Sequence, residues 1–208
     1  MTWLARMHLS KDALEYCRFR DAYAWHQAVW DCFPHMPQAR RDFLTRTDWL
    51  PQGCRLYLLC RSEPARPAWC PPESWACKKI SPSFLAHDAY GFDLLANPTR
   101  KVASFTANGQ QTRNGKRLAL LDEGQRRAWL QGKGAQHGFC LDESVPLTID
   151  EAGSQVFLRR TQPGTHIGVR FRGRLHVTER ERFVQAFHKG IGSAKAFGFG
   201  MLVLQPLF

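Results

Sequence analysis

Alternating apolar and polar residues predict a strand near the start of the chain and a helix after it. Trp3 to Leu9 alternates with the period of two that is typical of a half-buried strand. From Ala22 to Phe33, apolar residues recur at helical spacing and share one face. Pro34 ends that pattern, because proline cannot continue a helix. Further strands are predicted at Phe43–Trp49 and Arg55–Arg61.

The second half of the chain repeats this order after a proline-rich segment, which is predicted to be a loop. The elements predicted there are strands at Tyr90–Ala96, Gln155–Thr161 and His166–Val177, helices at Glu123–Leu130 and Glu179–His188, and a last strand. Residues 162–164 are predicted to turn between two of these strands, and Thr178 to cap the second helix with Glu181 in a capping box. Two successive β-α-β-β orders favour an α+β fold of two tandem ferredoxin-like, RRM-type domains, at residues 1–86 and 87–208.

The charge of the chain is strongly positive. Its 208 residues include 29 Lys and Arg against 18 Asp and Glu, a net charge of +11. Such an excess indicates a polyanionic partner, with nucleic acid first and an acidic membrane second. No long basic run is present, so the charge is expected on folded surface. The alternative is a basic protein whose charge serves only solubility.

Cysteine usage argues against a metal cluster and a disulfide framework. The seven cysteines form no C-x-x-C pair, and an odd number is typical of reduced thiols in a cytosolic protein. We therefore predict no metal and no cofactor. The first segment is too short and too charged for a signal peptide, and no apolar stretch approaches the ~20 residues needed to span a bilayer. A soluble, cytoplasmic protein without membrane contact is expected.

A glycine-rich segment near the end of the chain is the most distinctive local feature. Its glycines lie at Gly190, Gly192, Gly198 and Gly200, with Lys195 among them. Glycine backbone beside a lysine suits a phosphate-rich ligand held by N–H groups. The spacing matches neither the dinucleotide-binding fingerprint nor the Walker pattern. The alternative is a tight turn with no ligand.

The helix at residues 22–33 carries the candidate catalytic residues. Tyr23, His26 and Trp30 fall on one side at i, i+3 and i+7. Histidine is the usual general acid or base near neutral pH, and Tyr23 could orient it or donate a proton. The alternative is a histidine that only packs beside a core tyrosine.

Basic residues gather in two further places that suit RNA. Three arginines on the last long strand recur at period two and therefore share one face of the sheet, where they could pair with phosphates. The predicted RNA-binding residues outside the glycine segment are Arg159, Arg160, Arg170, Arg172 and Arg174 in one hairpin, and Arg113, Lys116 and Arg117 in a second basic loop. The alternative is a solvated basic face.

Two short H-x-Ser/Thr triplets suggest a different enzyme class. They begin at His8 and His176. Paired triplets of this form, one per lobe, occur in two-histidine phosphoesterases, which hydrolyse small cyclic phosphates. The pattern is short, and Thr178 of the second triplet is already predicted to cap a helix.

Three blocks of sequence resemble one known family. YAWHQAVWDCFP (Tyr23–Pro34), FDLLANPTRK (Phe92–Lys101) and GIGSAKAFGFGMLVLQP (Gly190–Pro206) look like the CasE-type CRISPR-associated repeat-processing endoribonucleases. The blocks come in the family's order and the resemblance covers nearly the whole chain. The glycine-rich block is the most specific of the three.

The resemblance implies an activity and partners. It implies tandem ferredoxin-like domains that bind the hairpin of a CRISPR repeat transcript and cleave it at the base of the stem without a metal. It also implies that the enzyme stays on its product and joins other subunits of a Cascade-like effector complex. The family's helix-borne histidine matches His26, and its associated tyrosine matches Tyr23.

RNA chemistry fits such an activity. The 2′-hydroxyl next to the scissile phosphate is an internal nucleophile, so the protein needs only to align it, move protons and stabilise charge. His26 is assigned to proton transfer, as general acid to the leaving 5′-oxygen or as base, and Tyr23 to assisting it. The products would carry a 2′,3′-cyclic phosphate and a 5′-hydroxyl. A non-catalytic RNA-binding subunit and the phosphoesterase remain as alternatives.

Overall fold

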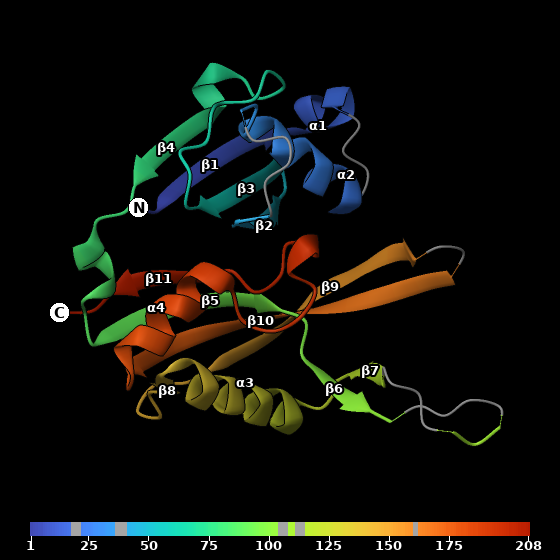
Figure 1. Cartoon of the computed structure of the whole chain (residues 1–208), viewed down its shortest axis with the longest axis vertical. Helices are drawn as coiled ribbons and strands as arrows, with labels where there is room; N and C mark the ends of the chain where they lie inside the picture. Colours follow the sequence, from blue (N-terminus) through green and yellow to red (C-terminus); the bar gives the residue numbers. More distant parts are fainter. Residues whose placement is uncertain (18–21, 36–40, 104–107, 111–114, 160–161) are drawn as a thin grey trace.

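A computed structural model describes residues 1–17, 22–35, 41–103, 108–110, 115–159 and 162–208. Its backbone forms two antiparallel sheets that lie one above the other, with a short separate hairpin at one end (Figure 1). The first sheet ends at Lys79 and the second begins at Ala89. The division into domains at residues 86 and 87 stays a prediction.

The first sheet has the strand order β2-β3-β1-β4. This is the order of a ferredoxin-like unit in which β1 lies between the third and fourth strands. A proline-rich segment with one 3-10 turn occupies the place of the second helix. The elements are β1 (Trp3–Ser10), α1 (Lys11–Cys17), α2 (Ala22–Ala28), the 3-10 helix η1 (Val29–Cys32), β2 (Phe43–Leu50), β3 (Gly53–Cys60), η2 (Pro72–Ser74) and β4 (Trp75–Lys79).

Alternation along β1 decides which face of the first sheet is covered. Ala5, Met7 and Leu9 are at most 1% exposed and pack in a core with Trp25 of α2 and Val29 of η1. Four of the seven cysteines are buried on this side, where they act as small apolar residues. This core fixes α2 on the sheet.

The second sheet has the order β11-β5-β10-β8, with β9 also paired to β10. Along the chain, α3 lies between β5 and β8, and α4 lies between β10 and β11. These four strands and two helices again form a ferredoxin-like unit. The elements are η3 (Pro82–Leu85), β5 (Ala89–Ala96), β6 (Thr99–Val102), β7 (Lys116–Ala119), α3 (Glu123–His137), β8 (Phe139–Leu141), β9 (Thr148–Arg159), β10 (Gln162–Val177), α4 (Arg180–Lys189), η4 (Lys195–Phe197) and β11 (Leu202–Pro206).

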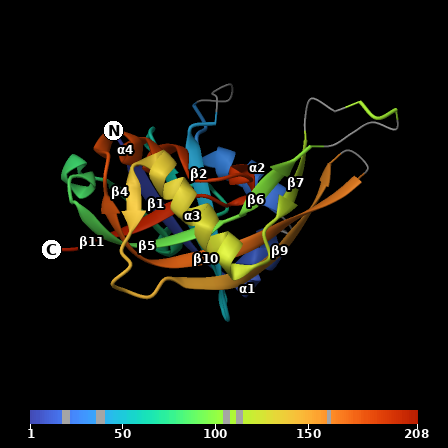
Figure 2. The ribbon, with the colours of Figure 1, turned by 90° about the horizontal axis from the view of Figure 1, so that it is seen from below.

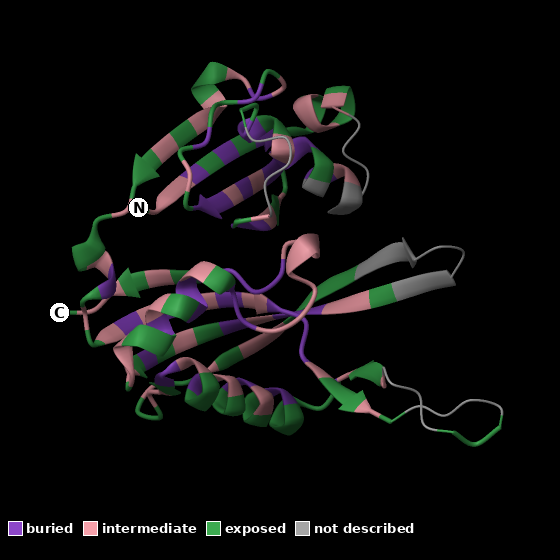
Figure 3. Ribbon diagram, in the orientation of Figure 1, coloured by how far each residue is buried: buried purple, intermediate pink, exposed green. Residues whose placement is uncertain are grey.

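One face of the second sheet is covered by its two long helices. Phe171 stacks on Trp129 of α3, with ring centroids 5.9 Å apart, and Tyr90 packs against Phe183 of α4. Figure 3 shows the buried residues concentrated within each sheet and beneath these helices. The α+β fold of two tandem ferredoxin-like units, predicted from the order of elements, is therefore confirmed.

Several local predictions were wrong. The helix predicted over 22–33 is α-helical only to Ala28 and continues as a 3-10 helix, so Trp30 is not at an α-helical i+7 position. Residues 162–164 lie in β10, because Gln162 pairs with Arg159, and only 160–161 separate the strands. The helix that begins near 123 extends to His137, where Gly138 ends it at φ +75°.

The predicted cap of α4 was also wrong. Glu179, not Thr178, is the N-cap, and its side chain accepts a hydrogen bond from the Arg182 backbone N–H at 3.0 Å. The Thr178 N–H instead donates to the Gly138 carbonyl at 2.9 Å. The cap is therefore the acidic residue one position after the threonine, and the threonine N–H pairs with the glycine that ends α3.

Candidate nucleic-acid interface

The helix that carries Tyr23 and His26 lies where three predicted parts of the site meet. α2 packs against η4, which belongs to the glycine-rich segment, and against β9 of the long hairpin. Trp25 is 7% exposed and anchors the helix in the first core. The side chains of Tyr23 and His26 lie outside the described part of the structure, so their chemical roles stay predictions.

The glycine-rich segment is a folded loop whose shape depends on positive φ at several residues. Gly190, Gly192, Gly198 and Gly200 have φ between +73° and +88°. A Cβ on Gly200 would lie 2.6 Å from the carbonyl oxygen of Ile191. The backbone N–H of Ile191 in turn donates to the Gly200 carbonyl at 2.8 Å. These glycines therefore shape a turn, as the simpler interpretation of the sequence expected. Phosphate binding by the loop stays a prediction.

The four glycines differ in what surrounds them. A Cβ on Gly190 would lie 3.0 Å from the side chain of Leu44 on β2, so this glycine also allows the loop to approach the first sheet. A Cβ on Gly192 would lie 3.1 Å from the ring of Trp129. Gly198 is the open one, since its Cβ would come no closer than 3.8 Å to any other atom. Gly198 is therefore the best of the four for separating function from packing.

Lys195 stands at the centre of a cationic cluster. Burial lowers the pKa of its amine, and the charges of Arg41, Lys133 and Lys189 lower it further. Its Nζ donates to the Lys189 backbone carbonyl at 2.8 Å, at the C-terminal end of α4. Burial and the charges of Lys133 and Lys195 likewise lower the pKa of His137. A group of neighbouring positive charges of this kind attracts an anion such as phosphate.

The loop is also tied to the long hairpin through a buried amide. Asn97 is 3% exposed, and its Nδ2 donates to the Ile167 carbonyl at 2.9 Å, beside the β-bulge of β10. The Ser193 hydroxyl lies 3.2 Å from both oxygens of Asn97. His166 packs on Phe197 of η4, with ring centroids 4.7 Å apart. Sequence reasoning missed Asn97, although it lies within one of the three blocks that suggested the family.

The three arginines of β10 share a face, but their surroundings differ. Arg170 is bound to Asp93, with its Nη2 2.5 Å from Oδ2, and it also approaches Asp48 on the first sheet. Arg172 forms an ion pair with Asp150 and is half-exposed. Arg174 is exposed. Arg170 therefore contacts carboxylates of both sheets at their junction. Phosphate binding by the three arginines stays a prediction.

The two hairpins that carry the remaining basic candidates extend, in their described parts, from one end of the molecule. The β9–β10 hairpin and the β6–β7 hairpin project at the end where α2 lies, as both views show (Figures 1 and 2). Lys116 and Arg117 are exposed on β7. Arg159 ends β9, but its side chain, together with Arg113 and Arg160, lies outside the described residues.

The two histidines of the phosphoesterase hypothesis, His8 and His176, do not lie together in this fold. His8 lies near the end of β1, which leads into α1, whereas His176 lies near the end of β10, beside β8. These ends are at opposite ends of the molecule (Figure 1). His176 lies 3.5 Å from Asp142 instead.

Comparison with known proteins identifies the family. A family model described as "CRISPR associated protein" matches residues 2–206. The chain belongs to this CRISPR-associated family. It is 29% identical, over 97% of its length and all of the relative, to the CRISPR system Cascade subunit CasE of Escherichia coli K12. It is 30% identical to the CRISPR-associated endoribonuclease Cse3 of Thermus thermophilus, over 62% of this chain and 61% of the relative.

Solved structures of CRISPR-associated proteins share the fold. Cas6e from Escherichia coli K-12 superposes with a TM-score of 0.74 at 24% identity, over the whole of both chains. Thermus thermophilus Cse3, bound to an RNA representing a pre-cleavage complex, gives 0.75 at 24% identity over 99% of each chain. The resemblance predicted from the three sequence blocks is therefore confirmed. None of the described helices is long and apolar enough to cross a membrane.

Proposed function

We propose that this protein is a metal-independent endoribonuclease that binds the stem-loop of a CRISPR repeat transcript and cleaves it at the base of the stem. It then stays on the product and joins the other subunits of a CRISPR effector complex in the cytoplasm. One observation carries the proposal: α2, the glycine-rich loop and the β9–β10 hairpin, each predicted to act on RNA for a separate reason, pack together. The names of the relatives, an endoribonuclease and a Cascade subunit, support the same function.

The proposed reaction uses the nucleophile of the substrate. The 2′-hydroxyl attacks the adjacent phosphorus and gives its proton to a general base or to water, while the bond to the 5′-oxygen breaks and that oxygen takes a proton from a general acid. His26 would supply the latter proton, and Tyr23 would orient or assist it. The products carry a 2′,3′-cyclic phosphate and a 5′-hydroxyl. No metal is needed, because the chain supplies proton transfer and positive charge itself.

The cationic cluster around Lys195 supports phosphate binding beside this centre. η4, which begins at Lys195, packs on α2. The like charges around Lys195 repel one another in the free protein, and a phosphodiester backbone would neutralise them. The exposed Lys116, Arg117 and Arg174 are proposed to extend the contact along the stem.

Incubation with hairpin repeat RNA tests the function. We expect equal cleavage in excess EDTA and with added Mg²⁺, and products that mass spectrometry identifies as 2′,3′-cyclic phosphate and 5′-hydroxyl ends. Cleavage lost on chelation and restored by a divalent ion would disprove the mechanism. Tight hairpin binding without cleavage under all conditions would instead identify a non-catalytic RNA-binding subunit.

A further inference from the structure

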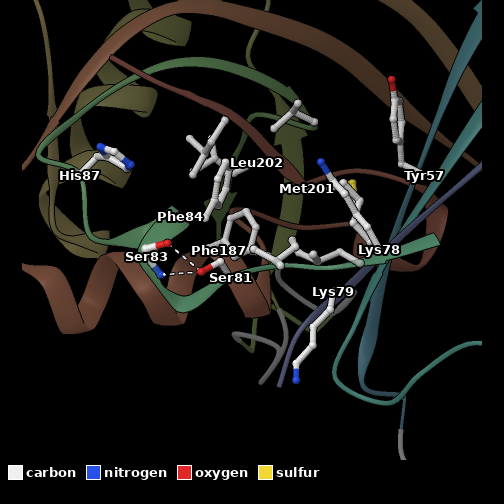
Figure 4. Close-up of a pocket in the computed structure, with 15 residues that line it drawn as sticks. Tyr57, Lys78, Lys79, Ser81, Ser83, Phe84, His87, Phe187, Met201 and Leu202 are labelled. Carbon is white, nitrogen blue, oxygen red and sulfur yellow. Dashed lines mark hydrogen bonds between the residues drawn. The ribbon is translucent and has the colours of Figure 1, made fainter. Parts of the chain in front are cut away.

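An apolar pocket lies between the two sheets, outside the candidate nucleic-acid interface. Its volume is about 400 Å³, which falls in the ~300–1,000 Å³ range of ligand pockets. It is bounded by the end of β4, by η3, by α4 and by β11 (Figure 4). The apolar side chains that line it are Leu4, Tyr57, Leu59, Ile80, Phe84, Phe187, Met201, Leu202, Val203 and Leu204.

The mouth of this pocket is basic. Lys78 lines it from β4 and His87 lies across from it, whereas the side chain of Lys79, also exposed, points away (Figure 4). Ser81 and Ser83 add hydroxyl groups, hydrogen-bonded to each other at 2.7 Å. Among these described lining residues none is acidic. The pocket therefore complements a ligand that combines apolar groups with negative charge.

Two sheet edges flank the pocket. β4 pairs only with β1, and β11 pairs only with β5, among the strands that the structure describes. Val203 on β11 is 36% exposed and lines the pocket. Open strand edges beside an apolar pocket are typical of surfaces that bind another polypeptide. A phosphodiester backbone would gain little here, because most of the lining is apolar.

The position of the pocket is compatible with simultaneous RNA binding. It lies at the end of the molecule that carries the last residues of β4 and the strand β11, whereas α2 and the two projecting hairpins lie at the other end (Figure 1). A partner seated in the pocket would leave the proposed RNA site open. This is what an enzyme that keeps its product and joins a complex requires.

We propose that this pocket is the docking site for a protein subunit of the effector complex, and that the subunit inserts a short segment with apolar side chains and at least one carboxylate. The apolar side chains fill the space beside Val203 and Phe84, and the carboxylate pairs with Lys78. This inference rests on the proposed function, since only a member of such a complex has such a partner.

Two variants test the site from its apolar and its charged side. Val203→Gln removes an exposed apolar group without adding charge beside Asp93, its cross-strand neighbour. Its control is Leu118→Gln on β7, an apolar residue that is also 36% exposed but lies outside the pocket. Lys78→Glu reverses the charge at the mouth, with Lys11→Glu on α1 as its control. Melting temperatures establish that each variant is folded.

The measurement is binding of each variant, preloaded with repeat RNA, to the purified effector subunits encoded with it. We expect at least tenfold weaker binding for Val203→Gln and Lys78→Glu, wild-type binding for both controls, and unchanged RNA cleavage by all four. Wild-type assembly by both pocket variants would overturn the proposal. Loss of hairpin affinity in them would assign the pocket to RNA instead, and a wild-type dimer abolished by Val203→Gln would assign it to a second copy. Failure of the wild-type protein to cleave RNA would refute the proposed function separately.

Discussion

Arg46 on β2 and Asp93 on β5 join the two sheets through a buried ion pair. The guanidinium Nη1 lies 2.9 Å from Oδ1 of Asp93 and also donates to the Asp93 backbone carbonyl at 3.1 Å. The Arg46 side chain is 1% exposed, and its Nε donates to Asp48 at 2.9 Å. Arg170 completes the network from β10. α2 packs on the first sheet, and the β9–β10 hairpin is part of the second sheet. The network therefore fixes these two parts of the proposed RNA site relative to each other.

Replacing Arg46 by methionine should destabilise the protein by about 3 kcal/mol, the lower end of the scale for breaking a buried ion pair, because Arg170 still pairs with Asp93 in the variant. Urea unfolding measures this loss. Arg61→Met is the control, because Arg61 pairs with Asp42 across 3.8 Å and both side chains are more than half exposed. That substitution should cost less than about 1 kcal/mol. Equal losses in the two variants would show that the network does not stabilise the junction.

The same network predicts a dependence of stability on pH. Burial alone would raise the pKa of Asp93, but hydrogen bonds from Arg170 and Arg46 outweigh it, and the pKa is lowered. In the unfolded chain an aspartate has a pKa of about 3.9. The unfolded state therefore binds the proton first as pH falls, so the contribution of Asp93 is complete above that value and is lost below it.

Asp93→Asn tests this dependence. The variant should be less stable than the wild type at neutral pH, and the difference in the free energy of unfolding should shrink as pH falls from about 5 towards about 2. Denaturant unfolding of both proteins across that range gives the difference directly. A difference that stays constant with pH would mean that Asp93 is not charged in the network.

The order of elements sufficed to predict the fold, but the packing between the sheets did not follow from it. Alternation in β1 and β5 gave their strands to within a residue, because each buries one face. β4 was missed, since its five residues follow a proline-rich segment and alternate weakly. The period of two correctly placed Arg170 with Arg172 and Arg174. It could not show that Asp93 neutralises Arg170, because that contact joins residues 77 positions apart. Asn97 escaped notice for the same reason.

His26→Ala should reduce cleavage by about two orders of magnitude or more, the usual scale for a general acid–base group. The affinity for hairpin RNA should change little, because one imidazole is a small part of a phosphate-dominated interface. Single-turnover cleavage and equilibrium binding on the same samples separate the two effects. His8→Ala is the control and should cleave normally. The reverse pattern, with His8 essential and His26 dispensable, would favour the phosphoesterase.

The three arginines of β10 should differ in role, with Arg170 stabilising the fold and Arg172 and Arg174 contacting RNA. Arg172→Gln with Arg174→Gln should weaken hairpin binding and reduce the slope of log affinity against log salt by somewhat under one unit for each lost phosphate contact. Arg170→Gln should mainly lower the melting temperature, because it removes one of the two arginines that pair with Asp93. Affinities measured between low and moderate salt, with thermal melting, test both expectations. An unchanged slope in the double variant would mean that this strand face does not contact RNA.

The glycine-rich loop offers a comparison of two positions with similar backbone and different space. Gly198 and Gly200 have φ of +82° and +88°, a region that costs a residue with a Cβ roughly 1–2 kcal/mol. Alanine at 200 would also place its Cβ 2.6 Å from the Ile191 carbonyl oxygen, whereas alanine at 198 meets nothing within 3.8 Å. Gly200→Ala should therefore lower the melting temperature by more than Gly198→Ala does. If the loop backbone binds RNA, Gly198→Ala should also weaken hairpin binding by more than its small loss of stability explains. Wild-type affinity in a folded Gly198→Ala protein would leave the loop with the structural role that its hydrogen bonds already define.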